Sequence, residues 1–216
     1  MPGRRKGKKA IVGIEAAIVL IAFVIVAAAL AFVVLNMGMF TTQKSKEVMN
    51  QALNEASSAL EVDGSVMAYV STSGKVVAIY IPLKISPGQQ AVDLSTDKID
   101  VVVRLPNGTF LKVNSGVAAP ASTPVNLTRL YEDSATSTSI NATFYIVQSL
   151  QNKGVPAFNV LEVGEKALLV IYLPTDLELG PYQSFTVEIR PLAGAPLTIE
   201  RMIPPTLPVG EVINLV

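Results

Sequence analysis

The chain has 216 residues, with 17 basic and 17 acidic side chains and no His, Cys or Trp. Five of the basic residues and none of the acidic ones lie within residues 1–10, so the remainder carries 12 basic and 17 acidic side chains, a net charge of −5. That mildly acidic body argues against nucleic-acid binding, which needs a basic surface. Without Cys there are no disulfides or thiolate metal sites, and without His the commonest general base and metal ligand are missing. These absences argue against an enzyme, and we predict no metal site and no cofactor.

The first predicted element is a long apolar helix near the N-terminus. Residues 16–35 are 20 consecutive residues drawn only from Ala, Val, Ile, Leu and Phe, which meets the length criterion for a membrane-spanning helix. Residues 11–40 would form a helix about 45 Å long at about 1.5 Å per residue, which exceeds a bilayer core of about 30 Å. Glu15 is the only charged residue between Lys9 and Lys44.

The helix is predicted to continue as an amphipathic segment. Within residues 41–62, apolar side chains recur every four residues from Val48 to Leu60, and polar side chains occupy much of the remaining surface. Asp63-Gly64 predicts the end of the helix. The sequence therefore predicts one helix over residues 11–63.

After Gly64 the pattern changes to alternating and short apolar runs separated by turn residues. Strands are predicted at residues 66–70, 75–81, 99–105, 109–113, 142–148, 167–173, 184–190, 197–202 and 212–216. The first two flank "STSG" as a hairpin, and the next two flank Pro106-Asn107-Gly108, a turn of the Asn-Gly kind. The predicted fold class is α+β, with the long hydrophobic helix followed by an antiparallel, Ig-like β-sandwich or barrel over residues 65–216.

One segment of this region, residues 114–139, is rich in Ser, Thr, Ala and Pro. We predict a short strand near residues 127–131 and otherwise an exposed loop, because long loops without secondary structure are usually functional or mobile. The region after Gly64 contains no GxGxxG motif, no P-loop and no internal repeat.

Three explanations compete for the first 40 residues. A secretory signal peptide cut near Ala29 or Ala31 fits poorly, because its apolar region normally runs about 7–15 residues. A simple membrane anchor would keep the basic N-terminus in the cytoplasm and place the β domain outside. A leader cut before the apolar block would leave the helix on the mature protein.

The third explanation is supported by a family resemblance. The stretch "KKA" followed by "IVGIE" resembles the class III (prepilin-type) signal of archaeal flagellins, also called archaellins, and of type IV pilins. In that pattern a short basic leader is cut before a hydrophobic helix, and an acid often stands at the fifth mature position. A cut between Ala10 and Ile11 makes Ile11 the first residue, Gly13 the third and Glu15 the fifth. Residues 1–10 would then be the cleaved leader.

The resemblance continues in "LNMGMFTTQKSKEVMNQALNEASSALEVDGSV", so that it covers roughly residues 4–66. It implies a structural subunit of the archaellum filament, a homopolymer of this chain, alone or with related archaellins, that drives swimming. Lys8 and Lys9 would serve recognition by a prepilin-type aspartic peptidase. An assembly ATPase and a membrane platform protein would then add the membrane-inserted precursor to an extracellular filament at the cell surface.

Two other functions stay open at this point. An archaeal type IV adhesion pilin would share the leader and the helix, and a membrane-anchored surface binding protein would keep the helix in the membrane. An enzyme has the least support, because the chain has no recognisable nucleophile motif and no His or Cys.

Glu15 is the candidate assembly residue. A carboxylate at the middle of a bilayer costs about 2.5–3.5 kcal/mol, but Glu15 would lie only about 6 Å from the mature helix end. We expect it to pair with the free amine of Ile11, its own or that of a neighbouring subunit, during docking. The alternative is an interfacial acid without a partner.

Three sequons occur in the β region, at Asn107, Asn126 and Asn141, each with Thr two residues later. In an exported protein they are N-glycosylation candidates, and the alternative is ordinary turn chemistry of Asn. The archaellin resemblance favours glycosylation, because archaellins are commonly N-glycosylated.

Two groups of acids are candidate calcium ligands. Asp93, Asp97 and Asp100 lie close together in the sequence, but their spacing fits no EF-hand loop. A solvated turn is the favoured interpretation for them and for Glu132-Asp133.

Overall fold

The structure is a computed structural model that describes residues 7–56, 60–118, 127, 130, 139–148, 159–192 and 194–215. Within the first of these segments, the side chains are described from residue 13 to residue 53. The chain divides into two compact units, Met1–Ala52 and Leu53–Val216. The first unit is helical, and the second is built mainly from strands.

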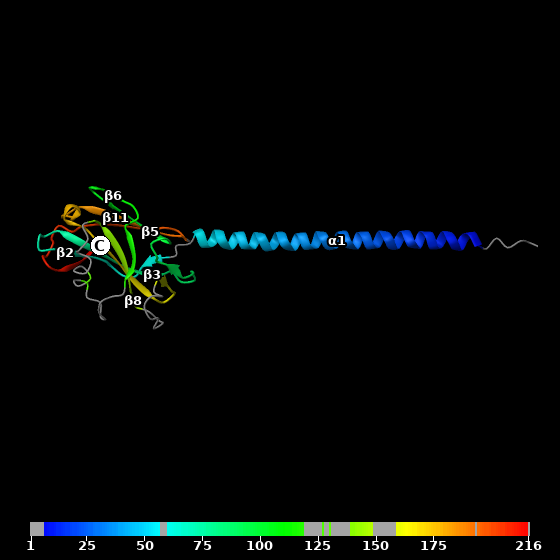
Figure 1. The fold of residues 1–216 in the computed structure, drawn as a ribbon, viewed down its shortest axis with the longest axis horizontal. Coiled ribbons are helices and arrows are strands. Elements are labelled where there is room, and N and C mark those ends of the chain that lie inside the picture. Colours follow the sequence, from blue (N-terminus) through cyan, green and yellow to red (C-terminus); the bar gives the residue numbers. More distant parts are fainter. Residues whose placement is uncertain are drawn as a thin grey trace, which may run out of the picture. The chain divides into compact units, whose positions relative to one another are not determined.

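The helical unit contains one continuous helix, α1 (Gly7–Ala56), which Figure 1 shows without a break. No Pro interrupts the stretch, and Ala, which favours helices, is frequent in it. Every described side chain of α1 is exposed within the chain. By length and composition, Gly13–Leu53 could cross a membrane, and none of it is buried against the rest of the described chain.

The predicted end of the helix at residue 63 is wrong. α1 ends at Ala56, and β1 (Leu60–Val62) pairs antiparallel with β3 (Val76–Ile85). Leu60 is 1% exposed and lies in the core of the β domain. The strand-built region accordingly begins at Leu60 rather than at residue 65, because pairing with β3 overrides the helical spacing of the apolar residues.

The described strands form three sheets. The seven-stranded sheet has the order β13 (Val212–Leu215), β2 (Val66–Val70), β3, β10 (Lys166–Tyr172), β8 (Asn141–Gln148) and β7 (Asn114–Ala118), with β1 paired to β3. The four-stranded sheet has the order β12 (Leu197–Met202), β11 (Ser184–Pro191), β5 (Ile99–Leu105) and β6 (Gly108–Phe110). β4 (Val92–Asp93) pairs with β9 (Val160–Leu161), and a 3₁₀ helix, η1 (Thr175–Leu177), follows β10. The predicted sandwich is confirmed, with one exception to its antiparallel pairing: β7 runs parallel to β8.

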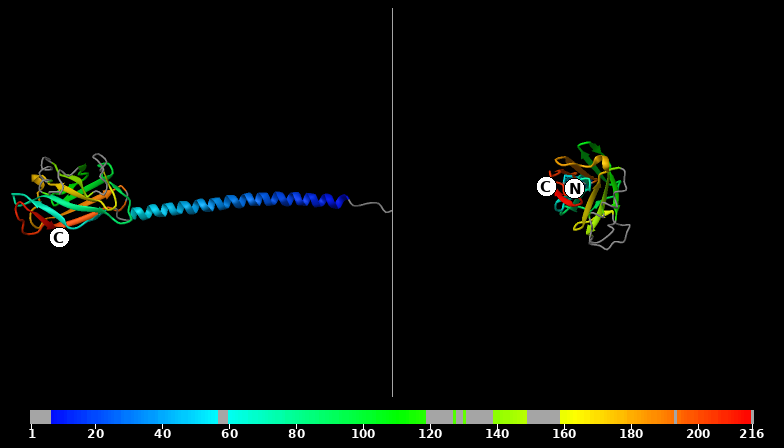
Figure 2. Two further views of the ribbon diagram at one scale, coloured as in Figure 1. Left: turned by 90° about the horizontal axis from the view of Figure 1, so that it is seen from below. Right: turned by 90° about the vertical axis from the view of Figure 1, so that its left-hand side faces the viewer.

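The core of the sandwich lies between the two larger sheets, which form two layers in Figure 2. Ile79, Phe144 and Leu169 from the seven-stranded sheet meet Val101 and Phe185 from the four-stranded sheet, and each of these side chains is at most 1% exposed. Along β11 buried and half-exposed residues alternate, as expected for a strand with one solvated face. β3 and β10 are instead buried on nearly every residue, because they occupy central positions in a sheet covered on both faces.

The β5–β6 hairpin differs from the prediction at its turn. Leu105 pairs with Gly108, so Pro106 and Asn107 form the two-residue turn rather than Asn107 and Gly108. Pro favours the second position of the commonest turn types because its φ is already fixed there. β6 then ends at Phe110, three residues earlier than predicted.

β3 is longer than predicted because it continues through Pro82. On that edge of β3 the neighbouring strand changes, since Tyr80 pairs with Met67 of β2 whereas Leu83 pairs with Val62 of β1. Pro82 has no backbone N–H to donate, but it lies where the hydrogen-bonded pairing of β3 changes from β2 to β1. Such an interruption of the ladder tolerates Pro.

The outer face of the seven-stranded sheet carries a second apolar cluster. Ala78, Tyr80, Tyr145, Leu168 and Val170 pack there with Leu130, which is 2% exposed. The Tyr80 hydroxyl donates a hydrogen bond of 2.6 Å to the carbonyl oxygen of Leu127. The strand predicted near residues 127–131 is wrong at its two described residues, Leu127 and Leu130, which have helical backbone. The predicted exposed loop is likewise wrong at residues 114–118, which form β7.

Four charged residues join the first strand of the β domain to its central strands. Lys166 Nζ lies 2.5 Å from Asp63 Oδ2, and Lys84 Nζ lies 3.7 Å from Asp63 Oδ1 and 3.6 Å from Glu61 Oε1. Lys84 and Lys166 stand directly opposite each other on β3 and β10, an arrangement that repels unless acids neutralise it. The hydrogen bond from Lys166 is the main cause that lowers the pKa of Asp63 from its ordinary value of 3.8; burial, the second cause, opposes it, and the charges of Lys166 and Lys84 add to the lowering.

Replacing Asp63 with Asn should lower the thermal unfolding midpoint of the full chain near neutral pH. A carboxyl whose pKa is lowered by folding contributes stability above its unfolded pKa, here 3.8, and loses that contribution as pH falls through the folded pKa. The difference between wild type and variant should therefore disappear in strong acid. Thermal unfolding in detergent at neutral and acidic pH measures this, with Asp97→Asn as the control for an exposed acid. An equal difference at both pH values would contradict the assignment.

Candidate assembly site

Glu15 lies at the start of an apolar groove on α1. The groove is lined by Glu15, Ala16, Val19, Leu20 and Phe23, whose spacing places them on one side of the helix. All five are exposed, and Glu15 makes no hydrogen bond or ion pair with any described residue. Within the described part of the chain, Glu15 is thus an unpaired carboxylate at the end of an apolar surface, which suits a partner that brings both an amine and apolar side chains.

The predicted cleavage site lies within α1. The helical backbone begins at Gly7 and continues through Lys8, Lys9, Ala10 and Ile11. The side chains of these residues lie outside the described ones, so no contact is assigned to them. The predicted cleavage residues and the predicted assembly acid thus share one helix, about one turn apart.

Two glycines of α1 stand in open space. A Cβ added to Gly13 or Gly38 would meet no atom of the described chain within 4 Å. A glycine inside a helix is destabilising by roughly 0.5–1 kcal/mol relative to Ala. Packing within the described chain therefore gives no reason for either glycine.

The second half of α1 carries a narrower apolar stripe. Val48, Met49 and Ala52 line a groove on this part of the helix, and Lys44 pairs with Glu47 at 2.7 Å beside it. This spacing agrees with the predicted amphipathic pattern on the described part of the helix, whereas Leu60, the last apolar residue of that pattern, lies in β1. The stripe extends the unburied apolar surface of α1 beyond the length that a bilayer core needs.

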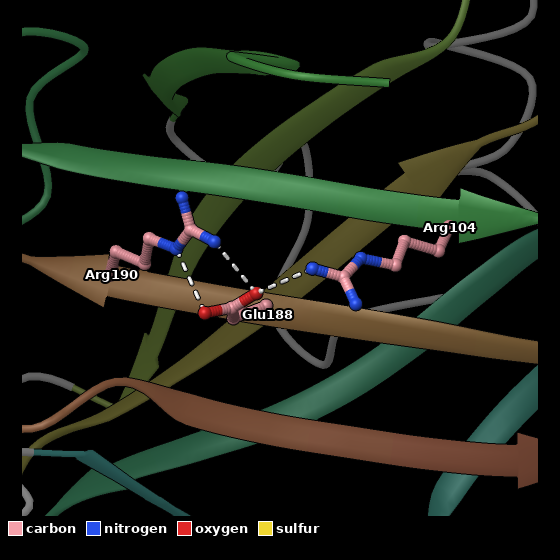
Figure 3. Close-up of polar contacts among 3 residues, drawn as sticks. All are labelled: Arg104, Glu188 and Arg190. Carbon is pink, nitrogen blue, oxygen red and sulfur yellow. Dashed lines mark hydrogen bonds and ion pairs between the residues drawn. The ribbon is translucent and has the colours of Figure 1, made fainter. Parts of the chain in front are cut away.

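A charged network that was not predicted from the sequence lies on the outer face of the four-stranded sheet (Figure 3). The Arg190 guanidinium donates two hydrogen bonds to the Glu188 carboxylate, at 2.8 and 2.9 Å, and Arg104 Nη2 lies 3.5 Å from Glu188 Oε2. The hydrogen bond from Arg190 is the main cause that lowers the pKa of Glu188. Val102, directly opposite Glu188, is 0% exposed. The two-residue spacing of Glu188 and Arg190 along a predicted strand is the signal that could have revealed the pair.

The three sequons lie in different environments. Asn107 and Thr109 are exposed at the tip of the β5–β6 hairpin. Asn141 is half-buried at the start of β8, and its Oδ1 accepts a hydrogen bond from the Ser115 hydroxyl. Asn126 lies outside the described residues.

The acids weighed as calcium ligands do not gather into a cation site. Asp93 Oδ1 accepts hydrogen bonds from the backbone N–H and the hydroxyl of Ser95, which close a local turn. Among the described residues, no group of three or more acidic side chains is placed to hold a metal ion. Glu132 and Asp133 lie outside the described residues.

Comparisons with known proteins agree with this architecture. A family model described as archaeal-type flagellin matches residues 10–201. The chain is 53% identical over 212 residues to probable flagellin 1 of Aeropyrum pernix, with 98% of each chain covered. It is 32% identical to probable flagellin 1 of Archaeoglobus fulgidus, with 94% of this chain and 93% of the relative covered.

Solved structures show the same likeness. The archaeal flagellum of Methanospirillum hungatei strain JF1 matches with a TM-score of 0.56 and 26% identity, over 94% of this chain and 99% of the other. The crystal structure of archaeal flagellin FlaB1 from Methanocaldococcus jannaschii matches in fold, with a TM-score of 0.58 and 16% identity over 72% of this chain and 95% of the other. Because the family model spans most of the chain and the relatives align with it almost end to end, the chain belongs to the archaeal-type flagellin family.

Proposed function

We propose that the chain is a structural subunit of an archaellum filament, in which copies polymerise through α1 at the cell surface for swimming. The observation that carries this proposal is the exposed helix: Gly13–Leu53 is strongly apolar and none of it is buried within the described chain. An apolar surface of this extent has to be covered by lipid or by other chains. The family assignment and the likeness to a flagellar filament favour other copies of the chain as the final cover.

The precursor would first insert into the membrane through α1. A prepilin-type aspartic peptidase would cut between Ala10 and Ile11, guided by Lys8, Lys9 and Gly13, and thereby remove the five positive charges of residues 1–10. Those charges favour the cytoplasmic interface, so their loss would ease extraction of the helix. An assembly ATPase and a membrane platform protein would supply the work of adding the subunit.

Close packing between helices would have to drive the transfer into the filament. Lipid already covers apolar surface, so moving α1 from lipid to protein brings no large hydrophobic gain. Small residues allow backbones to approach, and residues 16–35 contain seven alanines. Gly13 and Gly38, which no described atom of the chain approaches, are suited to the same purpose.

The experiment that tests this function is shearing of cells, imaging of the released material and identification of its subunits by mass spectrometry. We expect long filaments that contain this chain, and loss of swimming when its gene is deleted. Filaments that contain the chain in cells that still swim but no longer adhere would favour an adhesion pilin. Retention of the chain in the membrane fraction, with no filament, would favour an anchored surface protein.

Glycosylation is expected at Asn107 and not at Asn141. The sequon at Asn107 is exposed at a hairpin tip, whereas Asn141 is half-buried and engaged by Ser115. Mass spectrometry of filament peptides before and after deglycosylation should show a shift on the peptide that contains Asn107, and Asn107→Gln should remove it. An unmodified Asn107 peptide from native filaments would overturn the assignment.

A further inference from the structure

Tyr182 has an unusual backbone conformation in a rigidly held turn. Its φ is 63°, in the left-handed region that L-residues other than Asn and Asp rarely adopt. Pro181 precedes it, and the turn is closed by hydrogen bonds between Gln183 and Gly180 and by the Tyr182 N–H, which donates to the carbonyl oxygen of Ile203. The position calls for Gly in a turn of this type, yet the chain holds there a tyrosine whose side chain is 69% exposed.

A hollow of about 420 Å³ lies at the other end of the same strand. Its apolar wall includes Pro191 and Leu192, its cationic side chains are those of Lys98, Lys112 and Arg190, and its acidic side chains are those of Asp97 and Asp100. Leu192 is 76% exposed. Neither Lys98 nor Lys112 forms an ion pair with a described residue. Apolar side chains together with unpaired cations favour the binding of an aromatic ring. The ring packs against the apolar side chains, and its face attracts a nearby cation.

Two further features of the hollow are typical of a binding site. Lys112 has a φ of 54°, so the two non-glycine residues with positive φ in the described chain are Tyr182 and a residue that lines this hollow. Backbone strain of this kind gathers at functional positions. Asp100, which also lines the hollow, has a buried Oδ1 with no hydrogen-bond partner.

Tyr182 and the hollow lie at opposite ends of one strand, β11. Tyr182 lies two residues before β11 (Ser184–Pro191), and Arg190, Pro191 and Leu192 lie at its end. Eight strand residues span about 27 Å at about 3.4 Å per residue, so one Tyr182 cannot fill the hollow of its own chain. When two different surfaces of one chain bind each other in neighbouring copies, the contact is head-to-tail, and such contacts generate open helical filaments when they do not close a ring.

We propose that Tyr182 of one subunit inserts into the Lys98–Lys112–Leu192 hollow of a neighbouring subunit and so links the β domains along the filament. The occupant is a second copy of this chain, a choice that rests on the proposed filament function. The contact pairs an exposed aromatic anchor with a partly apolar, cation-rimmed receptor, a combination enriched in interface hot spots.

The first test separates the contact from any role in folding. Tyr182→Gly removes the ring and relieves the left-handed backbone, so the thermal midpoint of dissociated subunits in detergent should stay unchanged or rise. The temperature at which sheared filaments dissociate should fall, as measured by pelleting after heating. Val163→Ala is the matched control, since Val163 is 51% exposed and has no part in the contact. A fall in both midpoints, or in neither, would overturn the proposal.

The second test uses the absence of Cys from the chain. Filaments of the Tyr182→Cys, Leu192→Cys double variant, treated with a short bismaleimide, should give a ladder of covalent oligomers, whereas either single variant should give monomers only. Dimers from a single variant, or monomers only from intact double-variant filaments, would refute the head-to-tail contact while leaving the filament function in place. If the unmodified chain forms no filament at all, it is the proposed function that fails.

Discussion

Filaments are expected to disappear when Glu15 is replaced by alanine, while removal of the leader continues normally. Glu15 is exposed on α1, makes no hydrogen bond or ion pair with a described residue and stands at the start of an apolar groove. Cleavage before Ile11 would create an amine about one helical turn away, and a helix N-terminus itself favours a carboxylate. A charge-assisted hydrogen bond contributes about 1.5–3 kcal/mol, which corresponds to roughly a tenfold to hundredfold weaker docking of each subunit when it is lost.

The readouts for this substitution are the yield of sheared filaments and the N-terminal sequence of the subunits left in the membrane. Glu47→Ala is the matched control, because Glu47 lies on the same helix in an exposed pair with Lys44, and such pairs contribute about 0–1 kcal/mol. Glu15→Gln keeps the size of the side chain and removes its charge, so it should resemble Glu15→Ala. Normal filament yield from either variant would exclude the proposed pairing.

The second large effect is expected in the core of the β domain. Phe144 is 0% exposed and packs between the two larger sheets. Phe144→Ala should lower the free energy of unfolding by about 3–5 kcal/mol, because lost burial and a residual cavity add together. That loss is a large part of the roughly 5–15 kcal/mol that stabilises a typical domain. Denaturant unfolding of the full chain in detergent measures it, and filament yield should fall with it.

An exposed apolar residue provides the control for Phe144. Leu111 is 66% exposed, just after β6, so Leu111→Ala should change the free energy of unfolding by less than about 0.5 kcal/mol. Comparable losses for the two substitutions would mean that the core does not lie between the sheets.

Much of the fold could be predicted because its signals are local. The apolar composition of residues 16–35 and the alternation along β11 each indicate an element without reference to the rest of the chain. The end of α1 could not be predicted in this way, since Leu60 continues the four-residue spacing of the helix and becomes a strand only by pairing with Ile85. The parallel pairing of β7 with β8 has the same cause, because a Ser- and Ala-containing strand is selected by its neighbour rather than by its own composition.

The candidate site divides in a similar way. The proposed cleavage and assembly positions could be predicted from the sequence, because Ile11, Gly13 and Glu15 belong to one contiguous motif. Tyr182 could not be identified, because its significance depends on a positive φ, and Pro181 before it predicts only a turn. The hollow is also invisible in the sequence, since its lining residues belong to two separate stretches and to the loop after β6.

The measurement that tests the central claim most directly is N-terminal sequencing of the chain in sheared, imaged filaments. We expect Ile11 as the first residue of subunits in long filaments, with Glu15 therefore fifth. A first residue at Met1, or near residue 30, would contradict it, because the first result would leave the leader in place and the second would remove most of the apolar helix that assembly requires.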